Sequence, residues 1–142
     1  MPVGFKLLSE PPLLHVWLSG KVGLPDLLDR HKRYGGDPGF QPGVDELFDI
    51  RGATEIDLTF TQMRTLRHKK KAYYAQAPHK VRCAIIAPGD VQFGMGRMYA
   101  TLADLAGDQN VEVFRKADLA MAFLGISDSD LAQQLTEKCA AK

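Results

Sequence analysis

Two groups of residues in this sequence have the types and spacing to hold an anion or to support acid–base chemistry. The first group follows two expected strands and consists of Asp49, Arg51, Thr54, Asp57 and Thr59 after one strand, and Pro88, Asp90, Gln92 and the segment 94–97 after the next. In a sheet with parallel strands, ligand sites form beyond the carboxyl ends of the strands. The spacing therefore predicts a ligand site at that edge of the sheet.

Gly94 and Gly96 are expected to open a helix, where free backbone N–H groups and the helix dipole can hold a phosphate or carboxylate. Arg97 adds a side chain that can bind the same anion through two hydrogen bonds. The segment lacks the third glycine of a dinucleotide-binding fingerprint and the lysine of a phosphate-binding loop. The simpler interpretation is that both glycines let the helix start close against the sheet.

The second group is a dense basic run, Arg67, Lys69, Lys70 and Lys71, which Tyr73 and Tyr74 follow at once. Cations near a helix C-terminus are favoured by the helix dipole and usually face solvent. A basic patch with adjacent aromatic residues is also attracted to an anionic membrane, by about 1 kcal/mol per basic residue near the surface. The run is thus interpreted either as a solvated face or as an anionic-surface patch.

Composition excludes several classes of protein. The chain has 142 residues, of which 45% are hydrophobic and 25% charged, as in an ordinary single globular domain. Its formal net charge of +1 argues against a nucleic-acid partner. The N-terminus lacks the pattern of a signal peptide, so we expect a cytoplasmic protein, at most peripheral to the membrane.

Enzyme chemistry has weak support in the sequence. The four histidines and two cysteines show no metal-ligand spacing, and no nucleophile elbow is present. We therefore predict no metal, no cofactor and no catalytic residue. An enzyme that uses Asp49, Asp57 and Arg97 is kept as a third hypothesis.

The elements that must position these residues alternate along the chain. Apolar alternation predicts strands near residues 3–7, 14–18, 46–50, 82–88 and 110–115, with helices after residues 25, 59, 92 and 116 and a C-terminal helix at about 128–139. Residues 51–57 are expected to form a polar loop. This order predicts an α/β domain with a parallel or mixed sheet and helices packed on it.

Read together, the order of elements resembles the SpoIIAA-like family, the STAS/Sec14-like domains of bacteria. The resemblance rests on Leu47–Ile50 with its following loop, Phe93–Met98 and Val113–Gly125, and it spans about residues 4–126. It implies one domain over residues 1–142 with a four- or five-stranded mixed sheet, flanked by four to five helices. It also implies a regulatory or ligand-binding role rather than catalysis.

In the anti-sigma-factor antagonists of that family, a partner kinase phosphorylates a serine that follows the third strand. Here Thr59 stands at that position, Asp57 is kept and Phe60 replaces a glycine. A phosphate at Thr59 would suit a helix N-terminus electrostatically. The simpler interpretation is that Asp57 or Thr59 caps the helix.

The function predicted from the sequence is non-enzymatic binding of an apolar or amphiphilic small molecule, or association with a membrane surface. The helices after residues 57 and 92 are expected to move from the sheet and open an apolar pocket lined by Phe60, Met63, Phe93 and Met98. The alternative is a phospho-regulated protein-interaction switch with Thr59 as the modified residue and a protein partner. The oligomeric state is left open.

Overall fold

The computed structural model describes residues 2–9 and 12–126. Its elements in chain order are β1 (Val3–Ser9), β2 (Pro12–Gly23), α1 (Leu24–Gly35), β3 (Asp45–Asp57), α2 (Phe60–Ala75), β4 (Val81–Ile86), α3 (Asp90–Ala106), β5 (Gln109–Phe114) and α4 (Ala117–Phe123). This order confirms the predicted alternation of strands and helices. The C-terminal helix expected at 128–139 lies outside the described residues.

The five strands form one mixed sheet in the order β1-β2-β3-β4-β5. β1 pairs antiparallel with β2, while β2, β3, β4 and β5 run parallel to one another. The register aligns Val16, Phe48, Ile85 and Val113 across the four parallel strands. This mixed α/β sheet confirms the predicted fold class.

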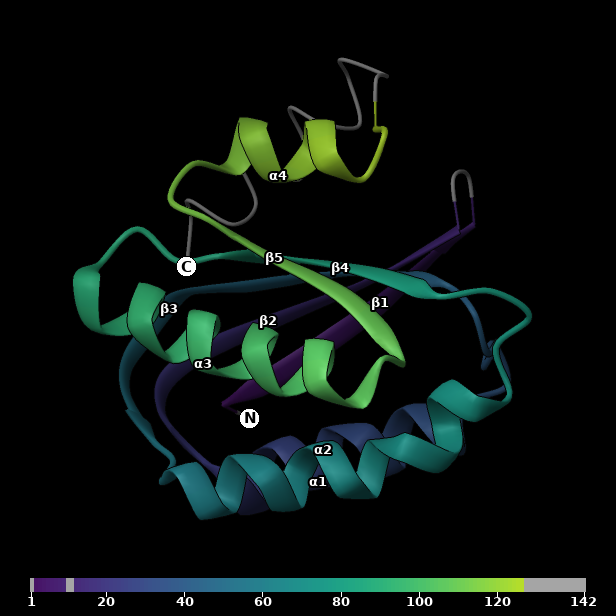
Figure 1. Cartoon of the computed structure of the whole chain (residues 1–142), viewed down its shortest axis with the longest axis horizontal. Helices are drawn as coiled ribbons and strands as arrows, with labels where there is room; N and C mark the ends of the chain where they lie inside the picture. The colour runs from purple at the N-terminus through teal and green to yellow at the C-terminus, as the bar shows by residue number, and fades with distance from the viewer. Residues whose placement is uncertain (1, 10–11, 127–142) are drawn as a thin grey trace.

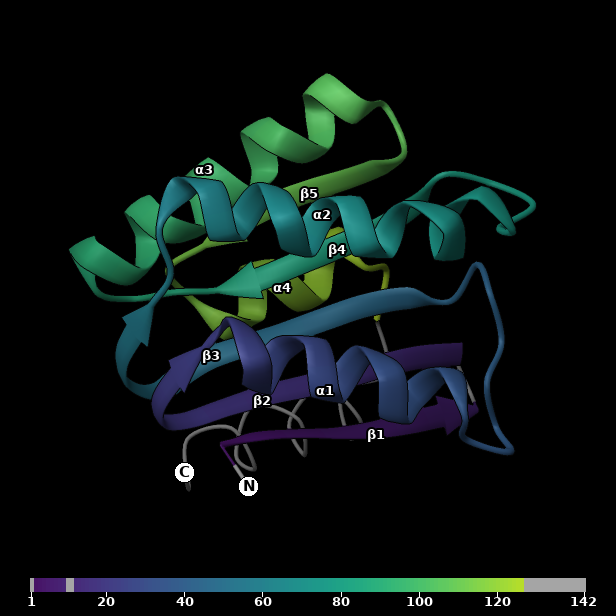
Figure 2. The same ribbon diagram turned by 90° about the horizontal axis from the view of Figure 1, so that it is seen from below.

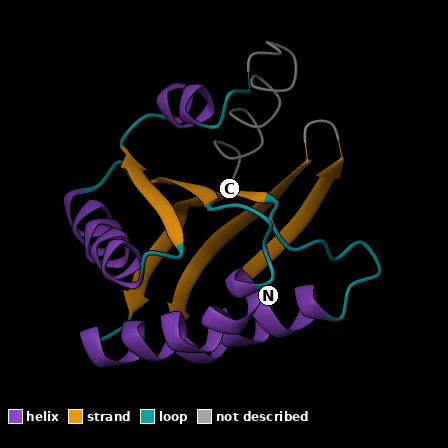
Figure 3. Ribbon diagram, turned by 45° about the vertical axis from the view of Figure 1, so that its right-hand side comes forward, coloured by secondary structure: helices purple, strands orange, loops and turns teal. Residues whose placement is uncertain are grey.

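Helices cover both faces of the sheet. α1, α2 and α3 lie side by side on one face, and α4 lies on the other (Figures 1 and 3). Seen from below, α1 and α2 run along the sheet next to each other, with α3 beyond α2 (Figure 2). The core beneath these three helices is the larger one, and α4 packs Ala120 and Met121 onto Leu47 and Ile86 in the smaller core.

Local sequence signals explain where the helices begin. Thr59 caps α2, since its Oγ1 accepts a hydrogen bond from the Gln62 amide while the Gln62 side chain accepts one from the Thr59 amide. Asp26 in the first turn of α1 accepts a hydrogen bond from the Gly23 amide at 2.9 Å. The capping interpretation of Thr59 is thereby confirmed.

Two sequence predictions about strand boundaries were wrong, since the strand expected near residues 14–18 continues to Gly23 and residues 51–57 belong to the next strand. Residues 51–57 are not a loop, because β3 continues to Asp57 and pairs with the second half of β2. The register shifts twice along this pair, near Gly20, which has a φ of 68°. These irregularities break the apolar alternation, so that the sequence hides the second half of both strands.

Candidate functional site

A cavity lies between the sheet and the helices α1, α2 and α3. Apolar side chains from all of these layers line most of it, among them Leu18, Leu27, Ile50, Met63, Ile85 and Met95. The centres of water-sized molecules can reach about 70 Å³ of it, several times the roughly 10–15 Å³ that one water molecule needs. The larger core therefore contains a real space rather than solid packing.

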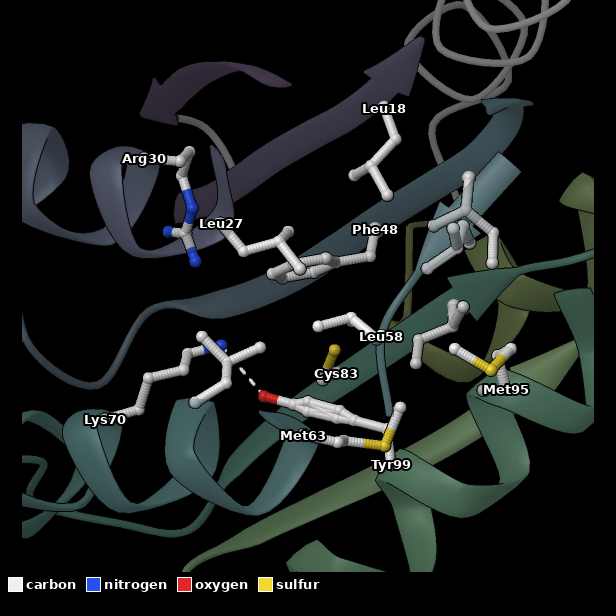
Figure 4. Close-up of a pocket in the computed structure, with 15 residues that line it drawn as sticks. Leu18, Leu27, Arg30, Phe48, Leu58, Met63, Lys70, Cys83, Met95 and Tyr99 are labelled. Atoms are coloured by element: carbon white, nitrogen blue, oxygen red, sulfur yellow. Dashed lines mark hydrogen bonds between the residues drawn. The ribbon is translucent and has the colours of Figure 1, made fainter. Parts of the chain in front are cut away.

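Two cations, Arg30 of α1 and Lys70 of α2, stand at one end of this apolar cavity. Their side chains point toward each other next to Phe48 (Figure 4). The Arg30 guanidinium carbon lies 5.4 Å from the centre of the Phe48 ring, and Lys70 Nζ lies 5.1 Å from it. Arg30 is only 2% exposed and Lys70 only 1% exposed, so bulk water contributes little to the solvation of either charge.

A hydrogen-bond network holds the Lys70 side of the cavity. Lys70 Nζ donates to the hydroxyl oxygen of Tyr99 at 2.8 Å, and Arg67 Nη1 donates to the same oxygen at 3.1 Å. Arg67 also forms an ion pair with Asp108 and donates to Gln109 Oε1 at 2.8 Å. This network joins α2 to α3 and to the start of β5.

The buried carboxylates of this region have partners other than the two cavity cations. Glu46 accepts hydrogen bonds from the Tyr74 hydroxyl at 3.1 Å and from Gln109 Nε2 at 2.7 Å. Among the described residues, no carboxylate lies within ion-pair distance of Arg30 or Lys70, and the buried Arg30 Nε has no hydrogen-bond partner. A buried charge without an ion-pair partner is unfavourable, so an anion at this end of the cavity would be electrostatically favoured.

His31, next to Arg30 on α1, lies in the positive electrostatic potential of Arg30 and Lys70. Burial lowers the pKa of His31 from 6.5 to about 4, with further contributions from the charges of Lys70 and Arg30. Its ring stands edge-on to Tyr73 with 5.7 Å between the ring centres. His31 is therefore neutral at physiological pH.

Cys83 of β4 also lines the cavity. Burial raises the pKa of its thiol, and the nearby charge of Glu46 raises it further. The thiol is thus protonated and poorly nucleophilic. Among residues 2–9 and 12–126, no group of three or more His, Cys, Asp or Glu side chains is placed to hold a metal ion.

The chain matches no protein-family model and no curated protein. Its fold does match a crystal structure, that of an uncharacterized DUF3478-family protein from Shewanella loihica PV-4, which has a SpoIIAA-like fold. The TM-score is 0.56, and the match covers 86% of this chain and 91% of the other. This chain has a SpoIIAA-like fold. The resemblance seen in the sequence is thus confirmed, and at 18% identity the match concerns the fold alone.

Within the SpoIIAA-like fold, only part of the predicted apolar pocket comes together. Met63 lines the cavity, whereas Phe60, Phe93 and Met98 do not. Phe60 is 50% exposed, and Phe93 packs beneath the Arg115 guanidinium, whose central carbon lies 4.4 Å from its ring centre. Of the four residues, Met63 alone belongs to the candidate site.

The sequence suggested that the two glycines of α3 open the helix. They do not, because α3 begins at Asp90. Their amides lie inside the helix and are not free to bind an anion, and Arg97 is exposed on the helix surface. A Cβ on Gly96 would meet Val113 Cγ1 at 2.9 Å, so this glycine lets α3 approach β5 closely. Gly96 also lines the cavity, whereas a Cβ on Gly94 would meet nothing within 4 Å.

Asp49 and Arg51 lie away from the cavity. Asp49 points to the face opposite that of Phe48, because successive strand residues alternate between the faces. It accepts hydrogen bonds from the Arg51 amide at 3.1 Å and from Arg51 Nε at 3.0 Å. Asp49 and Arg97 are therefore on opposite sides of the sheet, and the three residues of the enzyme hypothesis share no site.

The basic run of α2 does not form one surface patch of four cations. Arg67 and Lys70 are buried, and Lys69 and Lys71 are exposed. Helical spacing explains this division, since Arg67 and Lys70 lie on the same buried face of α2 as Met63 and Tyr74. That spacing was the available signal for Lys70. The basic ends of the first two helices were expected at one pole of the domain, which placed Arg30 near Lys70, whereas nothing local pointed to Tyr99 as a neighbour.

Proposed function

We propose that this chain is a non-catalytic binding domain that takes a small amphiphilic molecule into the cavity between the sheet and α1–α3. The observation that carries the proposal is an apolar cavity in the larger core that ends in two buried cations, Arg30 and Lys70. Ligand pockets commonly combine apolar walls with a few polar groups that fix orientation. The SpoIIAA-like fold supports a regulatory or binding role in general terms.

The cavity reaches the surface near the carboxyl end of β3. Its partly exposed lining residues there are Ile56 and Leu58, and Met95 of α3 is also partly exposed. Ligands of open α/β sheets bind at this end of the strands. Since the present space is small, a long apolar chain would require α2 and α3 to move relative to the sheet, as the sequence hypothesis supposed.

Association with a membrane is a further part of the sequence hypothesis. None of the helices in the described ranges is long and apolar enough to span a bilayer. Lys69 and Lys71 are the exposed cations that such a surface contact would use. A domain that exchanges an amphiphile with a membrane needs only transient contact of this kind.

Native mass spectrometry followed by organic extraction of the purified protein tests the proposal. Met95→Glu places a charge on a partly exposed wall of the cavity, and Val91→Glu places the same charge on an exposed position of the same helix. We expect a discrete amphiphile on the wild-type protein and on Val91→Glu, and none on folded Met95→Glu. A clean apo mass for the wild type, unchanged by incubation with medium-chain amphiphiles, would overturn the proposal.

A further inference from the structure

The unmatched positive charge at the end of the cavity defines the polar end of the ligand. We infer that this ligand is a single-chain amphiphile whose polar end is an oxyanion, a carboxylate or a phosphate monoester, held between Arg30 and Lys70. The inference rests on the proposed function and names its ligand class. It is carried by the geometry of three side chains at the cavity end.

The first of these side chains is Arg30. Its Nε is buried and has no hydrogen-bond partner, and no carboxylate of the described residues is within ion-pair distance of its guanidinium. Its guanidinium lies over the face of the Phe48 ring, which also lines the cavity. An oxyanion in the cavity would supply both the missing acceptor and the missing counter-charge.

Lys70 and Tyr99 complete the set of donors. Lys70 Nζ has three N–H groups, and within the described part of the chain it donates one hydrogen bond, at 2.8 Å to the Tyr99 oxygen. That oxygen also accepts from Arg67, and the described residues offer no acceptor for the Tyr99 hydroxyl hydrogen. Donors from α1, α2 and α3 thus meet around one end of the cavity.

Other polar ends fit this arrangement less well. A cationic end would be repelled by Arg30 and Lys70, and an alcohol or ester would leave both charges without a counter-ion. Asp108 pairs with Arg67, and Glu46 accepts hydrogen bonds from Tyr74 and Gln109, so neither carboxylate forms an ion pair with Arg30 or Lys70. The small cavity volume favours a single apolar chain over a two-chain lipid.

Calorimetric titration of the wild-type protein with matched probes tests the inference. Dodecanoate and dodecyl phosphate carry an oxyanion, whereas methyl dodecanoate has the same chain without a charge, and acetate and inorganic phosphate have the charge without the chain. Because hydrogen bonds to charged groups contribute about 1.5–3 kcal/mol, we expect a charged amphiphile to bind at least about tenfold more tightly than the ester. Whichever of the two charged probes binds more tightly identifies the headgroup.

Equal affinity for acid and ester would overturn the inference and leave the proposed function standing. Binding of none of the amphiphiles would overturn the proposed function itself. Binding of acetate or inorganic phosphate as tight as that of the charged amphiphile would overturn the amphiphile and indicate a site for free anions.

Variants then locate the charge. Arg30→Met and Lys70→Met should each lose the preference for acid over ester while still binding the ester, and Lys69→Met on the exposed face should keep it. An unaltered preference in both cavity variants would overturn the assignment of the two residues.

A further test uses the wild-type protein alone, so its result does not depend on whether a variant folds. Dodecanoate bound between the cations should raise the pKa of His31, which burial, Lys70 and Arg30 hold at about 4, and NMR titration of the imidazole measures it. A pKa of His31 that stays the same at saturation with dodecanoate would overturn the site.

Discussion

At the scale of single residues, side chains of one type have different roles in this protein. Lys70 is buried at the end of the cavity, whereas its neighbours Lys69 and Lys71 face solvent. Helical geometry separates them, since consecutive residues on a helix are about 100° apart around its axis. A dense basic run in the sequence is therefore not by itself a surface patch.

His31 should make stability depend on pH. Its pKa in the folded protein is about 4, below the ordinary 6.5, so the unfolded chain binds a proton at mildly acidic pH that the native protein does not. The free energy of unfolding should thus fall as the pH drops from about 6.5 toward about 4. Urea denaturation at about pH 7 and about pH 5 should show a larger fall for the wild type than for His31→Gln. Equal falls for both proteins would contradict the low pKa.

Thr59 should stabilise α2 through its cap. Thr59→Ala removes the acceptor for the Gln62 amide, and we expect the free energy of unfolding to fall by about 1 kcal/mol in urea denaturation. Thr59→Asp keeps a capping oxygen and should restore most of this loss. The phosphorylation of Thr59 stays a prediction, which phosphoproteomics of the native host would test. A Thr59→Ala protein as stable as the wild type would contradict the structural role of the cap.

At the scale of elements, close approach of a helix to a strand decides the shape of the cavity. α3 comes near β5 because position 96 has no side chain, and Met95 and Tyr99 on the same helix then reach the cavity. At the start of β4, Arg82 forms an ion pair with Asp45 and donates to the carbonyl groups of Phe123 and Leu124. The ends of α4 and of β3 are thereby joined.

The two glycines of α3 should respond in opposite directions to the same substitution. Gly94→Ala should raise the free energy of unfolding by about 0.5–1 kcal/mol, since alanine favours helix and nothing lies within 4 Å of the added Cβ. Gly96→Ala should lower it, because the added Cβ would meet Val113 at 2.9 Å. Thermal or urea denaturation of both variants measures the difference. Stabilisation by both substitutions would show that α3 can move from β5 without loss.

At the scale of the whole molecule, the protein keeps two unmatched cations inside its larger core. Such an arrangement is unfavourable for folding, since burying a charge without a counter-ion costs more than burying an apolar group. Sites that bind ligands often keep features that stability alone would remove. A bound oxyanion, as proposed, would supply the counter-charge that Arg30 and Lys70 lack.

Removal of one cation should separate stability from binding. In the ligand-free protein, Lys70→Met should raise the free energy of unfolding by about 1 kcal/mol, because replacing buried charged groups by apolar ones is commonly neutral or stabilising. The same variant should lose the added thermal stability that dodecanoate gives the wild type. Lys69→Met serves as the control at an exposed position. A large loss of stability in Lys70→Met would show instead that the ammonium group supports the fold through Tyr99.

The sequence by itself determined the order of strands and helices, the fold class and a helix cap at Asp57 or Thr59, of which the structure shows Thr59. These properties depend on apolar periodicity and on residues a few positions apart, so they can be recognised without knowledge of the rest of the chain. The SpoIIAA-like resemblance was recognisable for the same reason, because it rests on the order of elements. Of the four residues predicted to line an apolar pocket, Met63 lines the cavity, and the pocket as a ligand site stays a prediction.

Only the tertiary structure decided the full length of β3 and the composition of the site. β3 is long because it pairs with β2 through an irregular register that apolar alternation does not reveal. Arg30, Lys70 and Tyr99 meet because three helices pack side by side on one face of the sheet. Whether a cation is buried, and against which neighbours, depends on packing between distant segments, and no spacing within one segment contains that information.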